Sequence, residues 1–139
     1  MRELSFFVDG APKPQARPRA FRRGKHVAMY SPKSDWKKSV TFYAGQHGRL
    51  NGSLKVELHF LFKRPKSHYR TGKNSHILKD SAPYDMTNKP DLDNLAKAIY
   101  DACQDGGLIA DDSYIIESHC KKSYHEHKEG VQITFHELD

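Results

Sequence analysis

Residues 91–104 carry the strongest helical pattern in the chain, and this pattern constrains the fold more than any other feature. The apolar side chains of the segment recur at the spacing of one helix face: Leu92, Leu95, Ala96, Ile99 and Cys103. Pro90 precedes this stripe and Gly106-Gly107 follows it, and both positions are favoured for these residues at helix ends. Because a helix with one apolar stripe must bury it against a second layer, other elements have to pack on this one.

The remaining regular patterns are those of a second helix and of short strands. Residues 4–8 are apolar and β-prone, and residues 56–62 alternate as a strand with one buried face does. A helix is expected over residues 34–47, with Ser34 as its N-cap. One face of that helix carries side chains that we expect in the core: Trp36, Val40 and Tyr43.

The C-terminal part of the chain is predicted to add two more strands. Residues 114–124 and 131–135 are β-prone, and we expect them to pair as an antiparallel hairpin. The predicted order is therefore β-α-β-loop-α-β-β. This order predicts an α+β fold in which two main helices pack on a small mixed β-sheet, in a single domain over residues 1–139.

Two segments lack a regular pattern and are rich in basic side chains. Residues 11–24 hold three prolines among lysines and arginines, so an extended, irregular arm is expected there. Residues 66–90 form a long polar stretch without a clear period, and a loop of this length in a small domain is usually functional or disordered. Both segments are suited to lie along a phosphate backbone, although solvated loops would have the same composition.

The charge of the whole chain favours a polyanionic partner. Lysine and arginine number 23 against 17 aspartates and glutamates, a formal net charge of +6. Nucleic acid is the first candidate and an anionic membrane surface the second, while simple solubility also accounts for such a charge. No apolar run approaches the roughly 20 residues needed to cross a membrane, and the N-terminus does not read as a signal peptide. The two cysteines are not in a CxxC spacing, which predicts a reducing, cytoplasmic location.

Acidic side chains gather at the start of the predicted long helix and again after it. Asp91 and Asp93 stand one residue apart, and Asp111-Asp112 follow the glycine turn. Hard divalent cations bind several carboxylate oxygens that converge on one point, so we expect the chain to bring these acids together. The structural alternative is that Asp91 caps the helix and Asp93 interacts with the helix dipole.

The DxD pattern and the polar residues near it allow other interpretations. A calcium-binding EF-hand loop needs an oxygen ligand and then a glycine where Leu95 and Ala96 stand, so it is excluded. Lys97 lies four residues beyond Asp93, where it either neutralises a phosphate or forms an ion pair with Asp93 or Asp101. The HxH pair of His125 and His127 has no further ligand at a supporting spacing and is interpreted as solvated hairpin residues.

At these residues the chain resembles a known family. The segments KPDLDNLAKAIYDAC and GLIADD resemble the central signature of RusA-type Holliday junction resolvases, which are crossover junction endodeoxyribonucleases. The resemblance extends to GAPKPQARPRA near the N-terminus, to YSPKSDWKKSV, and to RPKSHYRTGKNSHILKDSAP, which is similar to a loop of phage and Gram-positive members. Gln15 and Ala16 depart from the pattern, because a lysine is common at that place.

The resemblance implies an activity and a set of site residues. Asp91 and Asp93 match the acids of the DxDN motif, Asp112 matches the acid of the later motif, and Lys97 matches the lysine after DxDN. The resemblance further implies that a homodimer cleaves four-way junction DNA in recombination and repair. It also implies that Asp91, Asp93 and Asp112 hold Mg²⁺ and that these three acids and Lys97 are the catalytic residues. The basic residues expected to contact DNA are Lys13, Arg17, Arg19, Arg22, Arg23, Arg70, Lys73 and Lys89.

Two alternatives remain open from the residues alone. The chain could be a non-catalytic nucleic-acid-binding module in which the acids only stabilise the helix start. It could also be a less selective nuclease that cuts branched DNA or flaps, because the chemistry would be the same.

Overall fold

The computed structural model of the chain describes residues 2–15, 19–23, 26–30 and 34–139. Its helices and strands follow one another as β1 (Glu3–Asp9), β2 (Arg19–Arg23), β3 (His26–Tyr30), α1 (Asp35–Ala44), β4 (Leu54–Lys63), α2 (Leu92–Asp105), β5 (Ile115–His125) and β6 (Gly130–Glu137). Three short 3₁₀ turns lie between them: η1 (Lys66–His68), η2 (Gly72–Asn74) and η3 (Asp112–Tyr114).

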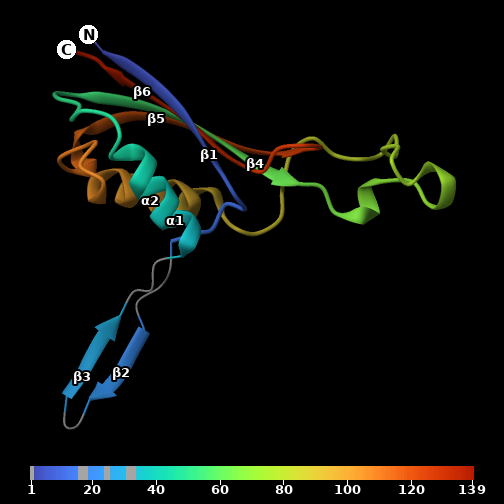
Figure 1. Ribbon diagram of the computed structural model, residues 1–139, viewed down its shortest axis with the longest axis horizontal. Helices are drawn as coiled ribbons and strands as arrows, with labels where there is room; N and C mark the ends of the chain where they lie inside the picture. The colour runs from blue at the N-terminus through green and yellow to red at the C-terminus, as the bar shows by residue number, and fades with distance from the viewer. Residues whose placement is uncertain (1, 16–18, 24–25, 31–33) are drawn as a thin grey trace.

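The main sheet has four strands in the order β1-β6-β4-β5. β6 is antiparallel to β1 and β4, whereas β4 and β5 are parallel, so the sheet is mixed. The two helices lie side by side on one face of this sheet, and both chain ends lie at its same end (Figure 1). The predicted α+β fold, with a small mixed sheet and two main helices, is thereby confirmed.

The predicted hairpin of the last two strands is wrong. β5 and β6 are not hydrogen-bonded to each other, because β4 lies between them and pairs with both. The inward side chains of β4 are almost fully buried, as Val56 and Phe60 at 0% exposure show. A strand with such a buried face is stabilised by neighbours on both sides, which places it at the centre of the sheet.

The predicted irregular arm is correct for residues 11–15, which have no regular secondary structure, but wrong further along. β2 and β3 pair antiparallel, with Arg19 opposite Tyr30, and form a separate two-stranded sheet. The reason lies in the position of the prolines, which precede residue 19. The backbone of β2 keeps all its N–H donors and can therefore pair.

The core lies between the helices and the inner face of the sheet. The apolar stripe of α2 is buried as predicted, with Leu95, Ile99 and Cys103 at 0% exposure. Gly106 marks the close approach of the two helices, since a Cβ atom at this position would lie 2.5 Å from the backbone oxygen of Thr41 in α1. The close contact requires glycine, and it holds the C-terminal end of α2 against α1.

Helix α1 begins as predicted and is shorter than predicted. The Ser34 side chain accepts a hydrogen bond from the Lys37 backbone N–H at 3.1 Å, which confirms Ser34 as the N-cap. Trp36 is buried, but Tyr43 is 46% exposed and does not belong to the core. The helix ends at Ala44, and its buried side chains recur along its whole length: Trp36, Lys37, Val40 and Ala44.

The polar segment between β4 and α2 extends beyond the sheet (Figure 1). It is ordered by η1, η2 and a bridge between Tyr69 and Leu78, and it returns along β5 through a bridge between Asp85 and Ser123. Among the described residues, no helix combines the length and the apolar character needed to cross a bilayer.

Candidate active site

Asp91 and Asp93 lie at the exposed N-terminal end of α2. Asp91 occupies the N-cap position, yet its side chain makes no capping hydrogen bond. Its carboxylate instead pairs with the ammonium group of Lys89 at 3.1 Å. Among the described residues, the hydrogen bond that Asp93 accepts comes from the backbone N–H of Asn94, at 2.9 Å. The Asp91 side chain therefore does not cap the helix, and both carboxylates face solvent.

A surface cavity of about 570 Å³ opens beside Asp91. One wall is the arm segment 12–15, and the other is formed by residues 89–91 and Asn94. The Gln15 backbone N–H donates to the Asn94 carbonyl oxygen at 3.1 Å, which fastens the arm to the first turn of α2. The arm thus brings Lys13 to the same cavity as Lys89 and Asp91.

Two lysines that the sequence did not single out hold this arrangement together. Lys37 of α1 is buried, donates to the Gln15 side-chain oxygen at 3.0 Å and pairs with Asp101 of α2. Lys122 of β5 donates to the backbone oxygen of Pro90 at 2.9 Å, so β5 supports the start of α2. Their position is a consequence of strand register and helix packing, although Lys37 belongs to the segment YSPKSDWKKSV that resembles the family.

Lys97 lies one turn after Asp93 on the exposed side of α2. Within the part of the chain that the structure describes, it forms an ion pair with neither Asp93 nor Asp101. Asp101 is instead paired with Lys37 from the neighbouring helix. The ion-pair alternative for Lys97 is therefore not found, and its ammonium group stays available to an anionic ligand.

Asp111 and Asp112 lie at the other end of α2. Asp112 begins η3, and its backbone N–H donates to the Gln104 side-chain oxygen at 3.3 Å. The Asp111 carboxylate accepts from the Ser113 backbone N–H at 2.9 Å, and hydrogen bonds from the Ser113 side chain and then from its backbone lower the pKa of Asp111 below its usual value. Asp111 therefore has a local capping role, while the Asp112 side chain is exposed.

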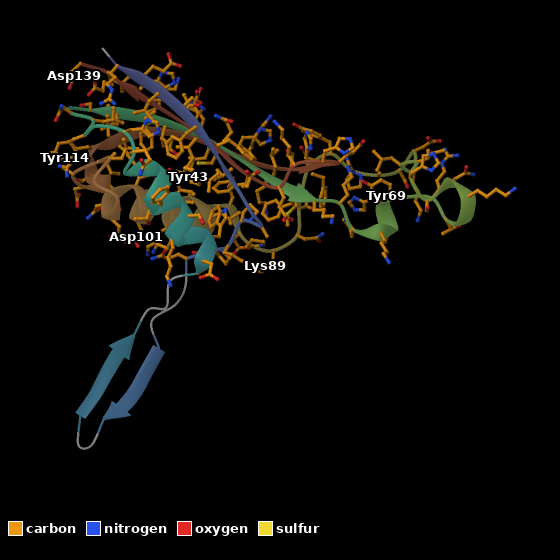
Figure 2. The ribbon with its side chains drawn as sticks, viewed as in Figure 1. Tyr43, Tyr69, Lys89, Asp101, Tyr114 and Asp139 are labelled. Atoms are coloured by element: carbon orange, nitrogen blue, oxygen red, sulfur yellow. The ribbon has the colours of Figure 1, made fainter. Side chains whose placement is uncertain are left out.

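Two measures show how far Asp112 is from Asp91 within one chain. Helix α2 has 14 residues, and a helix of that size is about 20 Å long. β5 then runs back along the helix, and the step from Ile115 to Lys122, which contacts Pro90, spans about 23 Å at the usual strand rise. Lys89 and Tyr114, which flank the two acidic segments, accordingly lie at opposite ends of the helical layer (Figure 2).

The convergence of three carboxylates predicted from the sequence is thus not found within one chain. No group of three metal-ligating side chains occurs among the described residues, Asp91, Asp93 and Asp112 included. The physical reason is the straight helix between the acids, because the short turn after it cannot return the chain to its start. Asp91 and Asp93 alone still suit Mg²⁺, which commonly binds one or two carboxylates together with water and substrate phosphates.

The basic residues predicted to contact DNA fall into three groups. Lys13 and Lys89 line the cavity beside Asp91. Arg70 and Lys73 lie on the polar segment between β4 and α2, where Arg70 forms an ion pair with Asp80 at 3.5 Å. The others cannot be placed: Arg17 lies outside the described residues, as do the side chains of Arg19, Arg22 and Arg23 in β2.

The histidine pair near the C-terminus lies in the connection from β5 to β6, which is not the hairpin that the sequence predicted. His125 accepts hydrogen bonds from the backbone N–H groups of His127 and Lys128, at 3.0 and 2.8 Å. This arrangement stabilises the turn between β5 and β6.

Comparison with known proteins gives two matches. The family model described as Endodeoxyribonuclease RusA matches residues 9–136, which is nearly the whole chain. The chain is also similar to the uncharacterized protein YqaN of Bacillus subtilis (strain 168). The two are 29% identical over 143 residues, which cover 97% of this chain and 96% of the relative.

Proposed function

The chain belongs to the RusA endodeoxyribonuclease family, and from this premise we propose that it resolves four-way DNA junctions by paired, magnesium-dependent nicks. The observation that supports this proposal best is the pair of carboxylates at the start of α2, Asp91 and Asp93. Both face solvent beside a cavity lined by lysines, and the Asp91 side chain makes no capping hydrogen bond. A role in DNA recombination and repair and a cytoplasmic location follow from the substrate and belong to the same proposal.

The carboxylates supply the metal-binding part of the proposed site. Asp91 and Asp93 would hold Mg²⁺ together with water and substrate phosphates, whereas Asp112 of the same chain lies at the other end of α2. When bound, the metal supplies an activated water and neutralises charge on the phosphate. The ion pair of Asp91 with Lys89 is solvent-exposed, and such pairs contribute only about 0–1 kcal/mol. Asp91 can therefore exchange this partner for a cation at little cost.

The lysines supply the phosphate-binding part of the proposed site. Lys97 presents an ammonium group one helical turn from Asp93, where it would stabilise the negative charge that develops on the scissile phosphate. Lys13 and Lys89, on the two walls of the cavity, would contact flanking phosphates and fix the position of the strand. These contacts carry no sequence information by themselves, which suits an enzyme that selects a DNA shape.

A comparison of labelled substrates under a magnesium titration tests the proposal. The substrates are a four-way junction, a flap and a linear duplex of the same sequence. We expect metal-dependent, symmetric nicks in the junction and little cleavage of the other two. Junction binding without cleavage at any magnesium concentration would instead identify a non-catalytic binding module. Equal cleavage of the flap would identify a less selective branched-DNA nuclease.

A further inference from the structure

Tyr84 is an exposed aromatic residue on a fixed backbone. It lies in the polar segment between β4 and α2 and is 55% exposed. Its backbone is held against β5, because the Tyr84 carbonyl oxygen accepts from the Tyr124 N–H at 2.8 Å and Asp85 forms a bridge with Ser123. A single exposed aromatic side chain is common on protein surfaces, so the neighbours of the ring decide whether it forms a site.

A cavity of about 260 Å³ opens beside the Tyr84 side chain. Two tyrosine rings, a cation, two imidazoles and a carboxylate line it: Arg64, Tyr84, Tyr124, His125, Glu126 and His127. Pockets for drug-sized ligands have volumes of roughly 300–1,000 Å³. The smaller volume of this cavity suits a single planar ring system.

Tyr124 and Arg64 give the cavity a rigid, largely buried wall. Tyr124 is 6% exposed, and its ring is contacted by the Arg64 guanidinium at 5.6 Å and by the His68 ring at 4.6 Å. Arg64 also donates to the Pro83 carbonyl oxygen at 2.6 Å, which fixes the residue before Tyr84. Because the wall is ordered without a ligand, little conformational entropy is lost when a ligand binds.

The polar groups at the cavity match those on the edge of a nucleobase. The Nε–H of Arg64 is buried and has no acceptor among the described residues. The Nδ1 atom of His125 accepts from two backbone N–H groups, which leaves the proton of the neutral imidazole on Nε2 as a second donor. The half-exposed carboxylate of Glu126 is an acceptor. Bases carry both acceptors and amino donors on their edges, so they can pair with both kinds of group.

The charge beside Tyr84 favours a ligand that carries a phosphate. The Lys121 ammonium group lies 5.8 Å from the centroid of the Tyr84 ring. Lys121 is not among the described residues that line the cavity. A base in the cavity would therefore stack on Tyr84 while the neighbouring phosphate contacts Lys121. A proline-rich peptide can also pack on exposed aromatic rings, but it has no phosphate for Lys121 and no base edge for Glu126.

Hydrogen bonds connect the wall of this cavity to the start of α2. The Tyr124 hydroxyl accepts from the Asn88 side chain at 3.1 Å. Lys122 donates to the backbone oxygens of Asn88 and Pro90, each at 2.9 Å. Asn88 precedes Asp91 by three residues, a span of at most about 11 Å. At about 3.4 Å per nucleotide, this span corresponds to roughly three steps along a DNA strand.

We propose that Tyr84 and this cavity bind one unpaired base of a DNA strand, a few nucleotides from the phosphate that lies at Asp91. The choice of DNA as the ligand rests on the proposed function, whereas the stacking site rests on the exposed ring, the ordered cavity and the neighbouring cation. Such a site favours DNA in which a base is available outside the duplex, because unstacking a paired base costs a few kcal/mol. It would thereby favour branched over linear DNA.

The site is tested by binding of fluorescein-labelled strands in EDTA, followed by anisotropy. The probes are a short oligothymidylate and a strand with the same number of phosphates but without bases. Tyr84→Ala should weaken binding of the oligothymidylate by about 5- to 150-fold, the range for loss of a base stacked on an aromatic ring. Tyr84→Phe keeps the ring and should bind within about two-fold of wild type. The base-free strand should bind wild type and Tyr84→Ala equally.

A 2-aminopurine in the strand gives a readout that a general loss of affinity would not give. Stacking on the ring should quench its fluorescence in saturated complexes with wild type and Tyr84→Phe, and this quenching should be absent with Tyr84→Ala. Tyr43→Ala is the matched control, because Tyr43 is 46% exposed on α1 and does not line the cavity (Figure 2). It should behave as wild type in both assays.

Equal binding of the oligothymidylate by wild type and Tyr84→Ala would overturn the proposal, and so would an equal loss with Tyr43→Ala. A proline-rich peptide whose binding depends on Tyr84 when that of DNA does not would assign the cavity to a protein partner instead. These results do not depend on cleavage, because EDTA removes the metal. A protein that binds bases through Tyr84 but never nicks in magnesium would refute the proposed function alone.

Discussion

Asp93→Asn removes one negative charge from the first turn of α2 without changing the size of the side chain. Asp93 is exposed, and its one hydrogen bond, from the Asn94 N–H at 2.9 Å, can also be accepted by an amide oxygen. The cost to stability is therefore limited to the lost interaction with the helix dipole, about 0.3–1 kcal/mol. At roughly 4 °C per kcal/mol for a chain of this size, the melting temperature should fall by no more than about 4 °C.

The effect on activity should be far larger than the effect on stability. Loss of a metal ligand removes several kcal/mol of transition-state stabilisation, and about 1.4 kcal/mol corresponds to a factor of ten in rate. Nicking should therefore fall by about 100-fold or more. Binding should stay equal or become tighter, since two like charges about 4 Å apart in water repel by about 1 kcal/mol, which corresponds to roughly five-fold in affinity.

The assay is nicking of a fluorescent four-way junction in magnesium, with binding followed by gel shift in EDTA and stability followed by thermal unfolding. Glu3→Gln is the matched control, because Glu3 is 66% exposed at the start of β1, away from the start of α2. It makes the same change of charge and should retain full activity. Wild-type nicking by Asp93→Asn would refute the role of this carboxylate, and an equal loss in Glu3→Gln would refute a site-specific effect.

Three further predictions concern the core, a thiol and the arm. Ile99→Ala should lower the free energy of unfolding by about 2–5 kcal/mol in urea titration, because Ile99 is fully buried; a change below 1 kcal/mol would contradict its place in the core. Burial raises the pKa of the Cys103 thiol to about 12. In native protein at pH 8 a thiol reagent should therefore leave Cys103 unmodified until urea is added. The protonated Cys103 thiol stabilises the fold below the pKa of the unfolded thiol, and this contribution should be lost as the pH rises from that pKa toward 12. Lys13→Ala should reduce the slope of the logarithm of the junction-binding constant against the logarithm of the salt concentration by about 0.9, the value of one phosphate contact. An unchanged slope would show that Lys13 does not contact the DNA. Arg19→Ala tests the arm in the same way.

Local patterns were sufficient for the two main helices, the strands of the main sheet and the first half of the candidate site. The periodic stripe of α2 and the N-cap at Ser34 depend on side chains within one or two turns, so they could be read directly and are found in the structure. The pair of Asp91 and Asp93 is equally local, because both belong to the start of one helix. The family of the chain could also be recognised from short motifs along it.

Strand order could not be predicted from local patterns. Residues 114–124 and 131–135 have the spacing of a hairpin, but pairing depends on which strand buries most surface at the centre of the sheet. β4 takes that place and separates β5 from β6. In the same way, β2 lay in a segment whose prolines suggested irregular backbone, although its own residues were free to pair with β3.

The sequence by itself determined which polar groups this chain carries and at what spacing: two carboxylates at a helix start, a third after the helix, a lysine one turn along, and an excess of basic side chains. Residue type and short spacing suffice for this, because hydrogen-bond and charge preferences act over a few residues. Only the tertiary structure decided where those groups meet. The rigid length of α2 keeps Asp112 far from Asp91 within a chain, while strand order leaves β5 open at an edge. Both are properties of packed elements, which depend on contacts between residues distant in sequence.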